Sequence, residues 1–177
     1  MILCMDAAYV NTEGAACGVV FPAADSSTPF KTYNAILDSV AAYVPGNFYL
    51  RELPLLIRVV EKVSEDLDLV IIDGYVWLPG GRFGLGAHLF NVFDERFPVI
   101  GIAKSLFKGH SSCEKVLRGR SRRPLYVTAA GIKCREAADT VRKMYGSFRI
   151  PEMMRIADKG ARSLIRIAGT DAEAEDG

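Results

Sequence analysis

The sequence predicts an α/β protein with a mixed β-sheet and helices on its faces. Three apolar stretches with short connections open the chain, which is the pattern of an antiparallel meander. Short, nearly all-apolar runs then alternate with segments of helical spacing, as expected of buried parallel strands and their covering helices. A chain of 177 residues, half of them hydrophobic and 24% charged, suits one domain with a substantial core.

The expected elements follow in order along the chain. Antiparallel strands are expected at Ile2–Val10, Ala16–Phe21 and Phe30–Val40, with Gly14 in the first turn. Later strands, expected to run parallel, are Asp68–Asp73, Pro98–Ala103 and Leu125–Ala129. Helices are expected at 48–63, 87–93, 134–145 and 151–167, with a glycine-rich loop at 75–86 and a basic loop at 105–124. This places one domain at residues 1–168 and an acidic, flexible tail at 169–177.

The composition excludes several classes of protein. No apolar run approaches the ~20 residues that cross a bilayer, and the first residues lack a basic signal-peptide region. The cysteines form no CxxC pair and histidines are few, so zinc is not expected; these residues are Cys4, Cys17, Cys113, Cys134, His88 and His110. We expect a cytoplasmic monomer with free thiols, in which any bound metal is a hard cation held by carboxylates.

The net charge of +1 conceals a strong asymmetry along the chain. Residues 1–103 carry 12 acidic and 6 basic side chains, residues 104–166 carry 5 and 16, and the last eleven residues carry 4 and none. A metal-dependent nuclease needs this combination, because carboxylates hold cations and basic side chains hold phosphates. Solvated helices rich in lysine and arginine would explain the same charges without a ligand.

Four carboxylates are the candidates for chemistry. Asp6 lies inside the apolar first strand, where an isolated charge is costly unless it is paired, hydrogen-bonded or metal-bound. Asp73 ends the fourth strand; if the two strands are neighbours, a divalent cation between the carboxylates would relieve their repulsion. Glu52 begins the first long helix and Asp158 lies on the last one. Alternatively, Asp73 is a turn residue, Glu52 a favourable acid at a helix N-terminus and Asp158 a surface acid.

Six short motifs occur in order along the chain: Asp6 in the opening strand, Tyr43–Gly46 followed by Leu50-Arg51-Glu52, Asp68–Gly74, Arg82–His88, Pro98–Lys104, and Phe148–Glu152 continuing to Asp158. Together they resemble the motifs of the endonuclease V family over about residues 2–160. The resemblance implies a ribonuclease H-like fold and an endonuclease that cuts DNA or RNA near a deaminated purine such as inosine.

The resemblance also implies a role for each site residue. The metal ligands would be Asp6, Glu52, Asp73 and Asp158, holding Mg²⁺ with Mn²⁺ able to substitute, and Lys104 would join the first three in catalysis. A wedge of Tyr43, Val44 and Pro45 would enter the nucleic acid, since everting a base costs least at a mismatch. The base pocket would contain Gly46, Gly74, Tyr75, Gly101 and Ala103. Phosphates would be bound by Lys108, Arg122 and Arg123 in the basic loop.

The chain departs from the family pattern after Asp73. The family typically has histidines in this stretch, whereas here Asp73-Gly74 is followed by Tyr75-Val76-Trp77. Tyr75 and Trp77 could form a different pocket, stack on single-stranded nucleic acid, or pack in the core. Two alternatives therefore stand beside the inosine-directed enzyme: a divergent nuclease with another substrate, and a non-catalytic nucleic-acid-binding module. The intact carboxylates favour an enzyme.

Overall fold

The structure, a computed structural model, describes residues 1–41, 49–109 and 113–174, with side chains up to Arg166. The strands are β1 Ile2–Val10, β2 Glu13–Phe21, β3 Lys31–Leu37, β4 Leu69–Asp73, β5 Trp77–Leu78, β6 Arg82–Phe83, β7 Val99–Ala103, β8 Glu114–Val116 and β9 Leu125–Ala130. The helices are α1 Tyr49–Lys62, α2 Leu85–Val92, α3 Cys134–Lys143 and α4 Glu152–Ala174, with a 3₁₀ turn at Pro79–Gly81.

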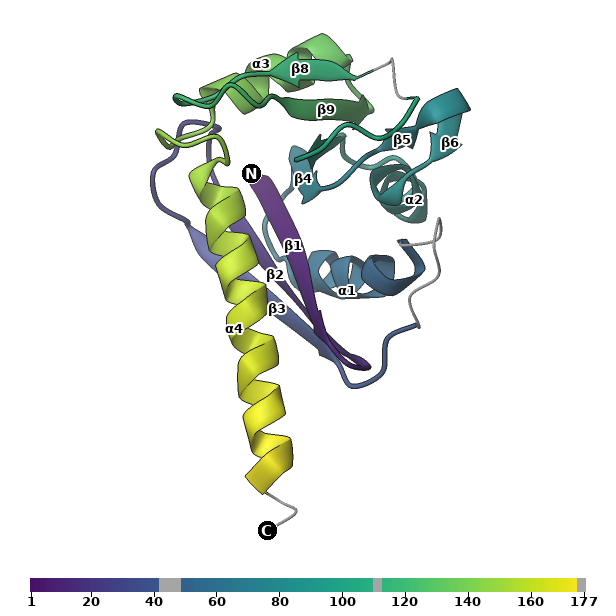
Figure 1. Ribbon diagram of the computed structural model, residues 1–177, viewed down its shortest axis with the longest axis vertical. Coiled ribbons are helices and arrows are strands. Elements are labelled where there is room, and N and C mark those ends of the chain that lie inside the picture. The colour runs from purple at the N-terminus through teal and green to yellow at the C-terminus, as the bar shows by residue number, and fades with distance from the viewer. Residues whose placement is uncertain (42–48, 110–112, 175–177) are drawn as a thin grey trace.

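Seven strands form one mixed sheet in the order β3-β2-β1-β4-β7-β9-β8 (Figure 1). The meander β1–β2–β3 is antiparallel, and β1, β4 and β7 run parallel. The mixed α/β fold is thereby confirmed. The expectation that the last strand also runs parallel was wrong, because β9 pairs antiparallel with β7. A parallel strand needs a crossover connection, whereas the described part of residues 104–124 contains no helix but the strand β8, which pairs antiparallel with β9.

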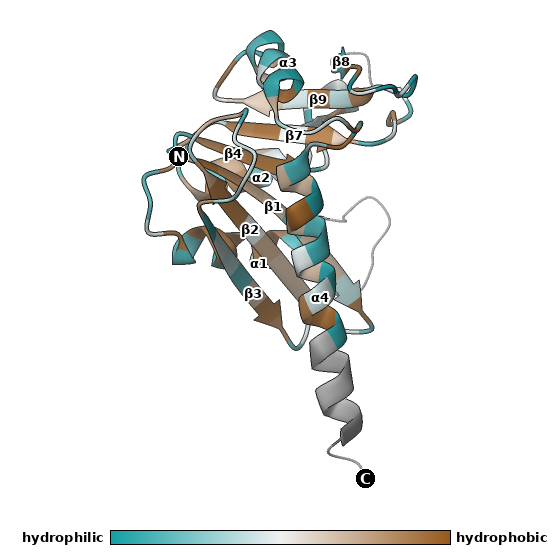
Figure 2. Ribbon diagram, turned by 90° about the vertical axis from the view of Figure 1, so that its left-hand side faces the viewer, coloured by the Kyte–Doolittle hydropathy of each residue, from teal (hydrophilic) through white to brown (hydrophobic). Residues whose placement is uncertain are grey.

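The helices cover the sheet from both sides. One apolar core lies between the sheet and α1 and α2, and it includes Leu3 and Met5 of β1. The other lies between the sheet and α3 and α4, and it includes Ile2 and Cys4. The central strands β2, β1, β4 and β7 are largely apolar, the edge strand β3 is partly hydrophilic, and α4 combines apolar with polar residues (Figure 2). Because side chains alternate along a strand, Asp6 belongs to the face that α4 covers.

Several elements differ from the sequence-based expectation. Gly14 lies inside β2, because the turn is made by Asn11 with a φ of 53°. The third strand ends at Leu37 and not at Val40. The loop at 75–86 contains the small hairpin of β5 and β6, and α4 continues to Ala174, so the first part of the expected tail is helical. Among the helices of the described ranges, none has both the length and the apolar character needed to span a bilayer.

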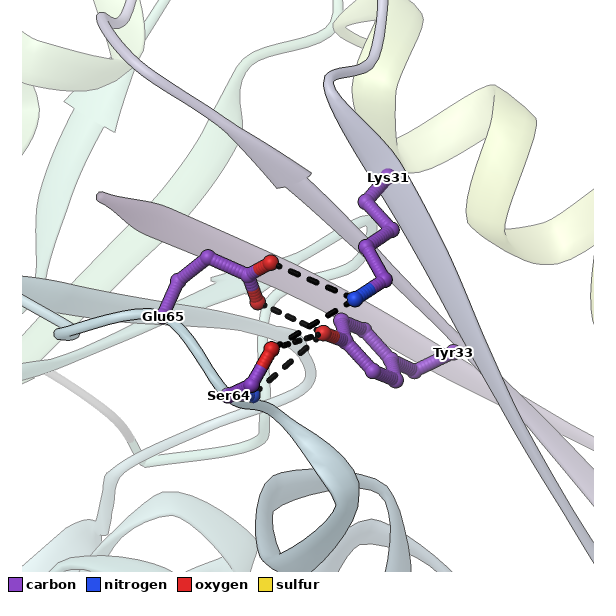
Figure 3. Close-up of polar contacts among 4 residues, drawn as sticks. All are labelled: Lys31, Tyr33, Ser64 and Glu65. Atoms are coloured by element: carbon purple, nitrogen blue, oxygen red, sulfur yellow. Dashed lines mark hydrogen bonds and ion pairs between the residues drawn. The ribbon is translucent and has the colours of Figure 1, made fainter.

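A polar network attaches the edge strand β3 to the segment that follows α1 (Figure 3). The Tyr33 hydroxyl donates to Glu65 at 2.7 Å and lies 2.9 Å from the Ser64 hydroxyl, while Lys31 lies within 3.5 Å of Glu65. These contacts cover one edge of the sheet with charged side chains, which discourages pairing with another chain.

The packing of α4 on the sheet depends on Gly160. A Cβ atom at this position would lie 2.5 Å from the Cys17 sulfur in β2. We expect Gly160→Val to lower the free energy of unfolding by about 1–3 kcal/mol, since overpacking outweighs the helix propensity gained. Urea denaturation measures this loss. The control is Ser163→Val on an exposed part of the same helix, and a Gly160→Val protein as stable as that control would contradict the close packing.

Candidate active site

The register of the sheet brings the first two carboxylates together. Met5 of β1 pairs with Ile72 of β4, so the next residue on each parallel strand is an aspartate, Asp6 and Asp73. Both follow a residue of the α1 side and therefore point toward the α4 side. The side-by-side arrangement expected from the sequence is confirmed by the strand pairing.

The other two acids lie within electrostatic reach of this pair. Burial, followed by the charge of Asp73, raises the pKa of Asp6 to about 7, and Asp158 on α4 adds to the increase. Glu52 is buried in the first turn of α1. Burial, followed by the charges of Asp6 and Asp73, raises the pKa of Glu52 to about 8. The fold thus gathers four carboxylates, separated by up to 152 positions in sequence, into one region.

Basic side chains form ion pairs with two of these carboxylates. The Lys104 ammonium, at the end of β7, lies 2.5 Å from the Asp73 Oδ2 atom. Burial lowers the pKa of Lys104, but the hydrogen bond and charge of Asp73 outweigh burial and raise it. Arg162, one turn after Asp158 on α4, donates to the Asp158 carboxylate at 2.7 Å. Lys104 and Arg162 therefore neutralise part of the negative charge of the acids in this conformation.

The donor set fits a hard divalent cation by its chemistry. All four candidate ligands are carboxylates, which suit Mg²⁺ or Mn²⁺. Burial, and after it the repulsion between neighbouring acids, raises the pKa of both Asp6 and Glu52. Across residues 1–41, 49–109 and 113–166, however, no three histidine, cysteine or acidic side chains are placed so that they could hold one ion together. Binding would require rotation of side chains and release of Lys104 from Asp73.

An apolar hollow of about 350 Å³ opens beside the carboxylates. Its lining includes Glu52 and Asp73 themselves, together with Gly74 and Tyr75 as expected from the sequence. Gly74 has a φ of +130° that a side chain would rarely adopt, and its N–H donates to the Ile102 carbonyl at 3.1 Å. This conformation lets the chain bend directly after Asp73, where β4 ends beside the hollow.

Two residues expected in the base pocket lie outside its lining. Gly101 is part of buried β7, where an added Cβ would lie 2.6 Å from the Gly74 carbonyl oxygen and 2.8 Å from the Val76 nitrogen. Gly101 thus makes room for the loop that lines the hollow. Ala103 is likewise buried at the end of β7. Small residues in a buried strand permit close backbone approach, which sequence alone does not separate from contact with a ligand.

The sequence interpretation did not assign six further lining residues to the pocket, all but Arg82 of them apolar or aromatic: Tyr49, Leu78, Arg82, Phe83, Leu85 and Phe107. These residues come from α1, the β5–β6 hairpin, α2 and the basic loop, so only the tertiary fold brings them together. His88 is packed, with its ring stacked on Tyr49 at 3.8 Å and edge-on to Phe83. The one signal in the sequence was the Arg82–His88 motif, which was interpreted only as a glycine-rich helix start.

The two aromatic residues after Asp73 have different surroundings. The Tyr75 hydroxyl donates to the Ser105 carbonyl at 2.8 Å and accepts from the Phe107 N–H at 3.1 Å. Tyr75 thereby joins the hollow to the beginning of the basic loop. The Trp77 indole donates to the Ala129 carbonyl and contacts the edge of Phe83, so it supports the hairpin behind the hollow.

The remaining predicted residues are placed as follows. The wedge residues Tyr43, Val44 and Pro45, with Gly46 of the base pocket, lie outside the described residues. The three basic residues assigned to phosphate binding are exposed: Lys108 directly after Phe107 of the hollow, and Arg122 and Arg123 between β8 and β9. Their assignment to phosphate stays a prediction.

The sheet order, with two aspartates side by side on β1 and β4, is that of a domain with a ribonuclease H-like fold. A family model described as endonuclease V matches residues 1–126. The endonuclease V of Geotalea uraniireducens is 32% identical over 182 residues, a match that covers 92% of this chain and 76% of the relative. The chain belongs to the endonuclease V family.

Solved structures agree with this assignment at the level of the fold. Endonuclease V from Streptomyces avermitilis has a TM-score of 0.82 at 23% identity, covering 95% of this chain and 82% of that one. Ciona intestinalis endonuclease V, solved with a 24mer DNA containing an inosine followed by a ribo-adenosine, has a TM-score of 0.74 at 17% identity, covering 94% and 86%. Among the relatives found by sequence, the match to the endonuclease V of Rhodospirillum centenum covers 62% of the length of that protein.

Proposed function

We propose that this protein is a Mg²⁺-dependent endonuclease that hydrolyses a phosphodiester bond near a deaminated purine in DNA or RNA. The observation that carries the proposal is that the carboxylate cluster and the apolar hollow share Glu52 and Asp73. A base held in the hollow would place its neighbouring phosphates beside the acids. The inosine-containing DNA bound by the Ciona intestinalis relative supports the same substrate class.

The hollow has the properties of a site for one everted base. Its volume of about 350 Å³ is at the lower end of ligand pockets. Enzymes that act on a base stack it between aromatic or apolar side chains and read its edge by hydrogen bonds. Here Tyr49, Phe83 and Phe107 offer apolar surface, and the Glu52 and Arg82 side chains in the lining offer polar atoms.

The carboxylates and Lys104 would divide the work of hydrolysis. Asp6, Glu52, Asp73 and Asp158 would hold the cation, which, when bound, polarises the phosphate and lowers the pKa of an attacking water. Lys104, exposed over 44% of its side chain, would exchange its ion pair with Asp73 for a phosphate oxygen of the substrate. Release of Lys104 would leave the Asp73 carboxylate free to help hold the cation. The wedge and basic-loop residues would hold the strand around the everted base.

Cleavage of matched oligonucleotides tests the proposal. End-labelled DNA and RNA strands carry one inosine or, in the control, adenosine at the same position. We expect cutting of the inosine strand with Mg²⁺ or Mn²⁺ and none with EDTA. Equal cutting of both strands would indicate a divergent nuclease. An absence of cutting with every divalent metal would favour a binding module and contradict the proposal.

A further inference from the structure

Two exposed aromatic residues lie on the connection between α3 and α4. Phe148 is 60% exposed and Tyr145 is 49% exposed. Scattered apolar residues on a surface need no explanation by themselves. Phe148 differs because basic side chains surround it: Arg120 from the turn after β8, Arg149 from the same connection, and Arg155 from α4. We call Phe148, Arg120 and Arg155 the Phe148 platform.

The platform is held in a defined position. Arg118 is buried and donates to carbonyl groups of the α3–α4 connection, including those of Met144 and Gly146. These bonds attach the turn that carries Arg120 to the segment that carries Phe148. The Arg155 guanidinium lies 4.9 Å from the centroid of the Phe148 ring and is also paired with Glu152 at 2.7 Å.

The platform is connected to the candidate active site. Arg149, the residue after Phe148, donates to the carbonyl of Lys104 and, at 2.8 Å, to that of Pro124. Lys104 in turn contacts Asp73 through its ammonium group. The exposed ring is therefore fixed relative to the strand end at which hydrolysis is proposed. A nucleic-acid strand that leaves the carboxylates on this side would meet the platform next.

There is open space around the Phe148 ring. Phe148 borders a hollow of about 470 Å³ with Arg120, Ser121, Ser147 and Arg149. It also borders one of about 370 Å³ with Arg149, Ile150 and Arg155. Proteins that bind single strands combine such basic grooves with aromatic rings on which bases stack. The surface thus offers a ring, space beside it, and positively charged side chains that line the same hollows.

We propose that Phe148 stacks on an unpaired base of the substrate strand outside the base pocket, while Arg120 and Arg155 bind its flanking phosphates. The proposal rests on the proposed function, because it extends the same bound strand. It favours a polyanionic strand over a protein, since residues 104–166, which contain the platform, carry 16 basic and 5 acidic side chains. It also predicts that the preferred substrate has unpaired nucleotides beside the damaged base.

Binding of labelled oligonucleotides in EDTA tests the platform without the reaction. The probes are an inosine-containing single strand and the same strand fully paired, and anisotropy gives the Kd. Phe148→Ala and Phe148→Leu should weaken single-strand binding at least about fivefold, whereas Phe148→Trp should retain it within about twofold. Duplex binding should change by less than about twofold in every variant. Ile36→Ala, an exposed apolar residue on β3, is the control and should bind as the wild type does.

Any one of three binding results would overturn the platform. The first is that Phe148→Ala leaves single-strand binding unchanged, the second is that Phe148→Leu binds as the wild type does, and the third is that a variant loses as much affinity for the duplex as for the single strand. Dimerisation that Phe148→Ala abolishes, with unchanged nucleic-acid affinity, would also overturn it in favour of a contact between copies. Cleavage by the wild type separates the two proposals. If the wild type cuts the inosine strand but Phe148→Ala binds as the wild type does, only the platform is refuted. If Phe148→Ala weakens single-strand binding but the wild type cuts no strand, only the proposed reaction is refuted.

Discussion

Asp73→Asn is expected to reduce cleavage of an inosine-containing strand by at least about 10³-fold, which corresponds to about 4 kcal/mol of transition-state stabilisation. The substitution keeps the shape of the side chain and removes its charge. Asp73 adjoins Asp6 across paired strands, holds Lys104 and borders the apolar hollow, so its loss affects cation, phosphate and base together. Single-turnover cleavage with saturating enzyme measures the effect.

The matched control for Asp73→Asn lies at the other end of the same strand. Asp68 precedes β4 and is 85% exposed, so Asp68→Asn should cleave as the wild type does. Circular dichroism and thermal melting should show that Asp73→Asn is folded, since its backbone continues to pair with Ile102. An Asp73→Asn protein that keeps more than about a tenth of wild-type activity would refute its place in the reaction.

Glu52→Gln is expected to make the metal-free protein more stable at pH 7, by about 3 kcal/mol, while it removes activity. Burial and the neighbouring aspartates raise the pKa of Glu52 to about 8 in the folded protein. In the unfolded chain the carboxyl has an ordinary pKa of about 4.3. Between these values the unfolded state releases its proton and the folded state retains it, so rising pH costs stability that glutamine does not lose.

The advantage of Glu52→Gln should therefore shrink as the pH is lowered and vanish near pH 4, where the carboxyl is protonated in both states. Urea denaturation in EDTA at pH 5 and pH 7 measures this dependence. Glu61→Gln, on the exposed side of the same helix, should show no comparable advantage at either pH. If Glu52→Gln were less stable than the wild type at pH 7, then the buried carboxylate would have a stabilising partner that outweighs its repulsion.

The sequence predicted the elements on which the site is built because local patterns report burial. The apolar runs that precede Asp6 and Asp73 indicated strands, and the structure places both residues at the expected positions of β1 and β4. The six motifs identified the family without any knowledge of which strands are neighbours. The antiparallel course of β9 was not predicted, because a short apolar run is the same in either direction.

By itself, the sequence determined the fold class, the family and the four carboxylates, since each depends on residue type and order along the chain. Only the tertiary structure decided the pairing of Lys104 with Asp73, the apolar hollow lined from four separate elements, and the place of Phe148 among three arginines. The physical reason is distance. Ion pairs, hollows and exposed faces arise between side chains that are remote in sequence, and no local pattern records which of them the sheet brings together.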